Sequence, residues 1–116
     1  MKIIYADPRR LPPEEEAKFD AGYRSLEELL READFVSLHP QLSPATRHLM
    51  SDAQFALMKA TAYIINTSRG PVVDEAALVR ALKAKKIAGA GLDVYEHEPQ
   101  VSPELTAMTN VVLTPH

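Results

Sequence analysis

The side chains of this 116-residue chain that could do chemistry each follow a short apolar run. They include a base, an acid and a permanent cation, namely His116, Glu98 and Arg69. The full set is Asp7, His39, Thr67, Ser68, Arg69, Asp93, Glu98 and His116. If the apolar runs are parallel strands, these residues meet at the carboxyl edge of one sheet, where such sheets bind their ligands. Because loops are polar in most proteins, this pattern is suggestive of a site and does not establish one.

Five apolar runs are predicted to form the strands that position these side chains. They lie at residues 3–6, 35–38, 63–66, 88–94 and 111–113. The run at 63–66 is rich in β-forming residues, and the run at 88–94 consists mostly of small ones. Near-continuous apolar runs are typical of parallel strands that are buried on both faces of a sheet.

Capping signals between the runs predict helices. Ser25 with Glu28 matches a capping box, and Ser51 opens a second box with a glutamine three residues later. Asp74 caps a third helix, and residues 14–19 form a short helix that begins after prolines. Strand and helix thus alternate about every 25–30 residues, which is the pattern of parallel βαβ units in an α/β fold.

The composition is that of one ordinary globular domain, and it excludes several functions. Apolar residues make up 46% and charged residues 25% of the chain. The net charge of −3 argues against nucleic-acid binding. The absence of cysteine excludes disulfides and thiolate metal sites, and we predict no metal site. We expect no membrane span, because no apolar run approaches the roughly 20 residues needed to cross a bilayer. We expect no signal peptide, because charged Asp7 follows closely on the first apolar residues, and therefore expect a cytoplasmic protein.

Three stretches carry a resemblance to a known family. IINTSRGPVVDE (residues 64–75), GAGLDVYEHEP (89–99) and NVVLTPH (110–116) stand in the order and at the spacing of that family's signature motifs. They resemble D-isomer-specific 2-hydroxyacid dehydrogenases, and most closely the glyoxylate/hydroxypyruvate reductase branch. The resemblance covers essentially the whole chain. It implies a parallel Rossmann-like sheet and an NAD(P)-dependent oxidoreductase.

The resemblance implies a role for each member of the acid, base and cation set. Hydride would pass between NAD(P)H and C2 of a small 2-oxo acid such as glyoxylate or hydroxypyruvate. His116 would act as general acid in reduction and as base in oxidation. Glu98 would hydrogen-bond the imidazole, fix its tautomer and favour its charged form. Arg69 would polarise the carbonyl and pair with the substrate carboxylate.

The same resemblance implies the residues that bind the cofactor. Asp7 matches the acid that binds the adenosine ribose hydroxyls, and Asp93 the residue that holds the nicotinamide carboxamide. The groove walls would comprise Pro40, Gln41, Thr46, Thr67, Ser68 and Arg69. Asp7 favours NAD because a carboxylate repels the 2′-phosphate of NADP. Arg9 and Arg10 follow closely and could receive that phosphate, so NADP stays open.

The chain departs from the family pattern in one respect. Its four glycines, Gly22, Gly70, Gly89 and Gly91, cannot form GxGxxG, the turn that receives the cofactor pyrophosphate. We therefore expect residues 1–116 to be a partial dinucleotide-binding domain without the first Rossmann strand, the glycine-rich turn or the substrate domain. The missing strand would be the central one, between the runs at 3–6 and 35–38.

Two functional hypotheses follow. In the first, the chain is part of a dehydrogenase that acts on a small 2-oxo acid and is a homodimer when intact. In the second, it is a truncated, non-catalytic α/β module that associates with itself through its unpaired strand edges. Arg69, Glu98 and His116 favour the first hypothesis for the parent protein. The missing glycine turn predicts that the isolated chain is inactive.

Overall fold

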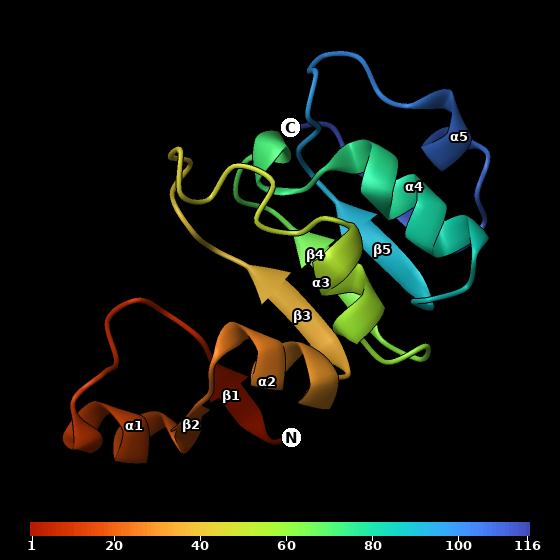
Figure 1. The fold of residues 1–116 in the computed structure, drawn as a ribbon. Coiled ribbons are helices and arrows are strands. Elements are labelled where there is room, and N and C mark those ends of the chain that lie inside the picture. The colour runs from red at the N-terminus through yellow and green to blue at the C-terminus, as the bar shows by residue number, and fades with distance from the viewer.

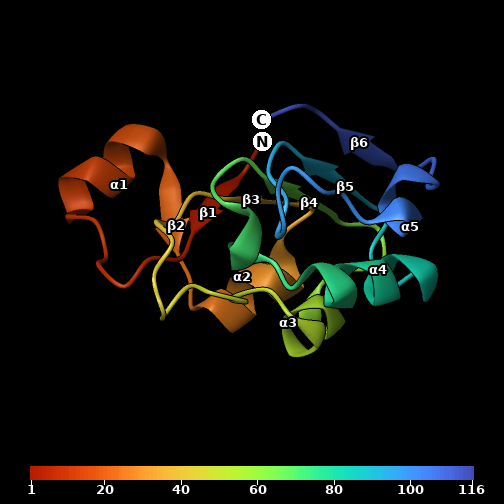
Figure 2. The same cartoon turned by 90° about the horizontal axis from the view of Figure 1, so that it is seen from above.

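In the computed structural model, which describes residues 1–116, six parallel strands divide into two sheets (Figures 1 and 2). The smaller sheet pairs β1 (Ile3–Tyr5) with β2 (Ala21–Tyr23). The larger sheet has the order β3-β4-β5-β6. Its strands are β3 (Phe35–Leu38), β4 (Tyr63–Asn66), β5 (Gly89–Leu92) and β6 (Val111–Leu113). The predicted α/β fold with parallel strands is confirmed.

Five α-helices and one 3₁₀ turn connect the strands. They are α1 (Pro13–Phe19), α2 (Leu26–Glu32), α3 (Asp52–Leu57), η1 (Gly70–Val72), α4 (Glu75–Lys83) and α5 (Pro103–Thr106). Ser25 and Glu28 form the predicted capping box at α2. Asp74 caps α4 by accepting the N–H of Ala77. None of these helices is long and apolar enough to cross a membrane.

Some element boundaries differ from the prediction. β1 ends at Tyr5, whereas residues 3–6 were expected, and β5 spans only Gly89–Leu92, whereas residues 88–94 were expected. The helix expected at residues 14–19 begins one residue earlier, at Pro13. The prediction also missed β2 and α5, of three and four residues respectively. Elements this short do not complete the repeat from which a period is recognised. β2 forms because β1 supplies its hydrogen-bonding partner.

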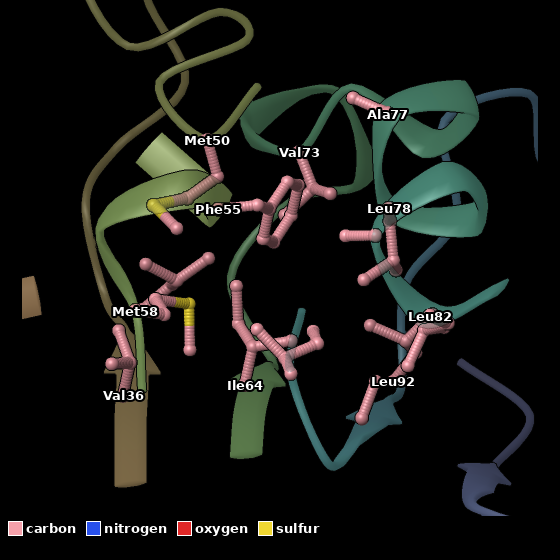
Figure 3. Close-up of a cluster of buried hydrophobic side chains, with 14 of the residues drawn as sticks. Val36, Met50, Phe55, Met58, Ile64, Val73, Ala77, Leu78, Leu82 and Leu92 are labelled. Carbon is pink, nitrogen blue, oxygen red and sulfur yellow. The ribbon is translucent and has the colours of Figure 1, made fainter. Parts of the chain in front are cut away.

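The core lies between the larger sheet and its helices. Figure 2 shows α2, α3 and α4 on one face of this sheet. Figure 3 shows the side chains that fill the space between the layers. Phe55, Ile64 and Leu78 are fully buried there, and Met50 closes the end of the cluster near α3. This packing fixes the strand ends that carry the candidate site.

The other face of the larger sheet is open, contrary to the expectation of strands buried on both faces. Phe35, Tyr63 and Val112 are 66%, 42% and 67% exposed on it. Phe35 and Tyr63 are register partners, and their rings stack with centroids 5.7 Å apart. Continuous apolar runs did not reveal this asymmetry, because they show what a strand can bury and not what covers it.

The two sheets do not join. β1 pairs only with β2, and β3 pairs only with β4, although Figures 1 and 2 both place β1 next to β3. The two strands that would flank the expected central strand have therefore not closed up. Their facing edges carry backbone groups without a strand partner, which is the arrangement that accepts a further strand.

Candidate active site

Asn66, the last residue of β4, shapes the loop that carries Arg69. Its amide is 1% exposed, and its Nδ2 donates to the carbonyl oxygen of Arg69 at 3.0 Å. Its Oδ1 accepts the N–H of Ser68 at 3.1 Å and the Ser68 hydroxyl at 2.7 Å. A buried amide with every bond directed to one loop holds that loop in a single conformation. Thr67 and Arg69 are exposed at its surface.

Gly70 brings this loop against a second loop, which follows β5. A Cβ atom at Gly70 would lie 1.8 Å from the carbonyl oxygen of Tyr95 and 2.6 Å from the backbone nitrogen of Glu96. Only glycine allows two backbones to approach this closely. The contact sets the distance between Arg69 and the loop that carries Glu98.

Glu98 and His116 form a direct pair. Nδ1 of His116 lies 2.8 Å from Oε1 of Glu98, and Oε2 of Glu98 accepts the N–H of Tyr95 at 3.4 Å. The hydrogen bond from His116, then the Tyr95 N–H and the charge of Arg69, hold the pKa of Glu98 below its ordinary value, against partial desolvation. Glu98 is therefore a carboxylate near neutral pH. Because Nδ1 faces this carboxylate, Nε2 of His116 is left for another partner.

Tyr95 fixes the segment that ends at His116. Its hydroxyl lies 2.7 Å from the carbonyl oxygen of Thr114 and 3.2 Å from that of Leu92. The ring is 7% exposed, and burial raises the pKa of the hydroxyl, which stays a neutral donor. The Thr114 hydroxyl in turn donates to Asp93 at 2.6 Å. Asp93, Glu98 and His116 are thereby tied to one scaffold.

An open pocket of about 440 Å³ lies beside the pair. Both Glu98 and His116 line it, together with Tyr95 and Pro99. Its remaining walls are Val101, Leu113, Thr114 and Pro115. The pocket is large enough for a small organic molecule, and a molecule bound in it would contact the His116 imidazole.

The residues assigned to cofactor binding lie on four separate loops, which follow β1, β3, β4 and β5. Pro40 and Gln41 follow β3, and the Thr46 hydroxyl closes that loop by donating to the Gln41 carbonyl oxygen at 2.6 Å. Thr46 therefore holds the loop together. Asp7 lies apart from them, after β1 in the smaller sheet, where its carboxylate accepts the N–H of Arg9 at 2.8 Å.

The sequence prediction missed the hydrogen bonds that anchor the Glu98 loop. Glu96 accepts the N–H of Glu75 at 2.9 Å, and Glu75 accepts the N–H of Glu96 at 3.0 Å. The sequence assigns nothing to His48, but in the structure its Nε2 lies 2.8 Å from Oε2 of Glu96. The backbone N–H of His48 donates to the Pro71 carbonyl oxygen. No local pattern could reveal this, because His48 and Glu96 lie 48 residues apart in the chain.

His48, Asp74 and Glu96 bring ligand atoms to within 4.8 Å of one another, a geometry compatible with a metal ion. Each side chain already has a protein partner, however. Asp74 accepts from the Ser51 hydroxyl and the Ala77 N–H, and Glu96 accepts from His48 and Glu75. We interpret the cluster as a hydrogen-bonded link between α4 and the Glu98 loop.

A protein-family model matches the whole chain. The model describes the D-isomer specific 2-hydroxyacid dehydrogenase, NAD binding domain, and it matches residues 1–116. A relative from Staphylococcus aureus (strain USA300), provisionally named a 2-hydroxyacid dehydrogenase, is 48% identical over 116 residues. That match covers 100% of this chain and 36% of the relative. The chain therefore spans about a third of the length of the curated relatives it matches.

Two solved structures share the fold closely. The holo form of Rhodotorula graminis D-mandelate dehydrogenase superposes with a TM-score of 0.95 at 46% identity, covering 98% of this chain and 33% of that one. A glyoxylate reductase from Paecilomyes thermophila gives a TM-score of 0.94 at 47% identity, covering 100% and 35%. These similarities confirm the Rossmann-like fold and do not favour the hypothesis of a non-catalytic module.

Proposed function

Because this chain belongs to the D-isomer specific 2-hydroxyacid dehydrogenase, NAD binding domain family, we propose that the whole protein is an NAD-dependent oxidoreductase. It reduces a small 2-oxo acid to the 2-hydroxy acid and catalyses the reverse oxidation. The observation that carries this proposal is the 2.8 Å contact between His116 and Glu98 beside an open pocket, with Arg69 near enough to lower the pKa of Glu98.

In this proposal, His116 moves the proton. Glu98 holds Nδ1 of the imidazole at 2.8 Å, so that Nε2 is directed to the substrate oxygen. In reduction, Nε2 donates a proton to that oxygen, and in oxidation it accepts one. Glu98 stays ionised and stabilises the imidazolium.

Arg69 binds the substrate in the same scheme. Its side chain makes one hydrogen bond, from Nη1 to the Ser68 carbonyl oxygen at 2.8 Å, so other donors of the guanidinium are available. A planar, permanently charged fork suits a carboxylate, and it also polarises the neighbouring 2-oxo group. Asn66 and Gly70 hold the backbone from which this side chain extends.

The residues present fit the two ends of a dinucleotide. Asp7, exposed after β1, would accept hydrogen bonds from the adenosine ribose hydroxyls, and Asp93 would hold the nicotinamide carboxamide. NADH supplies the hydride when bound. Between these ends, the loops with Pro40, Gln41, Thr46, Thr67 and Ser68 would form the groove walls. The pyrophosphate needs a glycine-rich turn, which we assign to the rest of the whole protein.

For the substrate, we propose glyoxylate or hydroxypyruvate. The support is the resemblance of residues 64–75, 89–99 and 110–116 to that branch, together with 47% identity to a protein described as a glyoxylate reductase. Nearly equal identity, 46%, to a D-mandelate dehydrogenase makes a bulkier aryl 2-oxo acid the necessary comparison. We also propose a homodimer for the intact enzyme, which sedimentation of the whole protein would check.

Steady-state assays of the whole protein test the proposal. NADH consumption should be measured with glyoxylate, hydroxypyruvate and phenylglyoxylate, and repeated with NADPH. We expect turnover with the two small acids that exceeds turnover with the aryl acid. Absence of NADH consumption with every 2-oxo acid would refute the oxidoreductase, whereas a preference for phenylglyoxylate would refute only the substrate.

A further inference from the structure

The loop between β1 and α1 carries two adjacent arginines in different environments. The side chain of Arg9 makes no hydrogen bond or ion pair, whereas Arg10 is held by Glu16 of α1. Nε of Arg10 lies 3.0 Å from Oε2 of Glu16, and Nη2 lies 3.3 Å from Oε1. This two-point contact occupies the Nε–Nη2 edge of the guanidinium, one of the edges with which an arginine binds an anion.

Glu16 is itself fixed in place. The Tyr5 hydroxyl donates to its carboxylate and also accepts the N–H of Leu11, which joins the loop to the last residue of β1. The Glu16 side chain is 14% exposed. Hydrogen bonds from Arg10 and then Tyr5 hold the pKa of Glu16 below its ordinary value, against desolvation, so the carboxylate is charged near neutral pH.

Tyr23 places Arg10 close to the end of β1. The guanidinium lies over the Tyr23 ring, 5.1 Å from its centroid, and the hydroxyl of the same ring lies 3.4 Å from the Asp7 carbonyl oxygen. Arg10 and Asp7 thus contact one aromatic side chain. If the Arg10 side chain were released from Glu16, it would lie on the same surface of this loop as Asp7.

We propose that Glu16 determines cofactor specificity by sequestering Arg10, an inference that rests on the proposed dinucleotide site. With Arg10 neutralised by Glu16, the loop presents Asp7 and Arg9, whose charges cancel. Such a loop favours the unphosphorylated ribose of NADH. Without the Glu16 charge, Arg10 adds one net positive charge beside Asp7, where the 2′-phosphate of NADPH would lie.

The test uses variants of the whole protein. The dissociation constants of NADH and NADPH are measured by fluorescence titration at one fixed ionic strength, because exposed charges are screened by salt. Glu16→Gln should raise the affinity for NADPH relative to NADH about tenfold, the effect of one added charge-assisted contact. Glu15→Gln is the matched control, because this neighbouring glutamate of α1 has no side-chain partner, and it should leave the ratio unchanged.

Arg10 supplies the second arm of the experiment. Arg10→Ala alone should leave the NADH-to-NADPH ratio as in the wild type, and Arg10→Ala combined with Glu16→Gln should cancel the gain. The inference is overturned if Glu16→Gln weakens both cofactors equally, if the double variant keeps the gain, or if Arg10→Ala alone weakens NADPH selectively. The last result would make Arg10 a phosphate ligand already in the wild type.

This experiment separates the inference from the proposed function. If neither cofactor binds the wild type, both fail together. If the cofactors bind but no 2-oxo acid is reduced, the proposed reaction fails while the affinity ratios still decide the role of Glu16.

Discussion

The Tyr95 hydroxyl lies 2.7 Å from the carbonyl oxygen of Thr114, two residues before His116. This contact joins the segment after β6 to the loop after β5, which carries Glu98. The Thr114 hydroxyl also joins the two segments by donating to Asp93 at 2.6 Å, and together these contacts bring His116 and Glu98 to 2.8 Å. Tyr95 therefore sets the geometry of the pair from a buried position.

Tyr95→Phe should lower kcat while reducing the free energy of unfolding only slightly. The loss of one buried hydrogen bond costs about 1 kcal/mol of unfolding free energy. Because His116 would be less well oriented, kcat should fall while the KM for cofactor stays close to its wild-type value. Tyr63→Phe is the control, since Tyr63 lies on the open face of the sheet. Equal kinetic effects of the two changes would contradict a positioning role for Tyr95.

His116→Gln should abolish most turnover and leave NADH affinity nearly unchanged. The imidazole meets the substrate and not the adenosine half of the cofactor, and loss of general acid catalysis costs about 10²–10⁴-fold in rate. Single-turnover kinetics and NADH titration separate the two effects. The control is His97→Gln, because His97 is 72% exposed and lies outside the pocket beside the pair. Normal turnover in His116→Gln would remove this residue from the mechanism.

Glu98→Gln should lower kcat less than His116→Gln, because the proton donor remains but loses its charged partner. It should also change the pH dependence of stability. The pKa of Glu98 is lower in the folded protein than in the unfolded chain, so the ionised carboxylate stabilises the fold above its ordinary pKa. That contribution is lost as the pH falls through the lowered value.

The stability difference between wild type and Glu98→Gln should therefore shrink as the pH falls below about 4. Urea unfolding at several pH values measures this difference. A difference that grows under acid would show that the assigned direction of the Glu98 pKa is wrong.

Much of the architecture could be predicted because its signals are local. Ser25 and Glu28 mark a helix start within four residues, and the runs at 35–38, 63–66 and 111–113 match β3, β4 and β6. The motif residues Arg69, Glu98 and His116 could be named because the motifs themselves are contiguous. In the structure Glu98 and His116 lie 2.8 Å apart, and their catalytic roles stay predictions.

The supporting residues could not be predicted, because their roles depend on distant partners. His48 adopts a left-handed conformation, with φ 53°, and meets Glu96 across the fold. Tyr95 lies within the motif at 89–99, but only the structure shows its hydroxyl between two carbonyl oxygens. Asn66 offered the one usable signal, a polar amide that ends an apolar strand and must find partners there.

Gly70→Ala should destabilise the protein far more than Gly91→Ala. A Cβ at Gly70 would lie 1.8 Å from the Tyr95 carbonyl oxygen, and backbone atoms cannot move aside as a flexible side chain can. The loops that carry Arg69 and Glu98 would have to separate, at a cost of at least about 2 kcal/mol in unfolding free energy.

At Gly91 the nearest atom is Cγ1 of Ile65, 3.9 Å away, which is ordinary contact. Neither glycine has a positive φ, so alanine is strained at neither position by its backbone angles. Gly91→Ala should therefore stay within about 1 kcal/mol of wild type, on the stabilising side because the unfolded chain loses freedom. Urea denaturation of the two variants measures both effects, and similar midpoints would show that the two loops are not held together at Gly70.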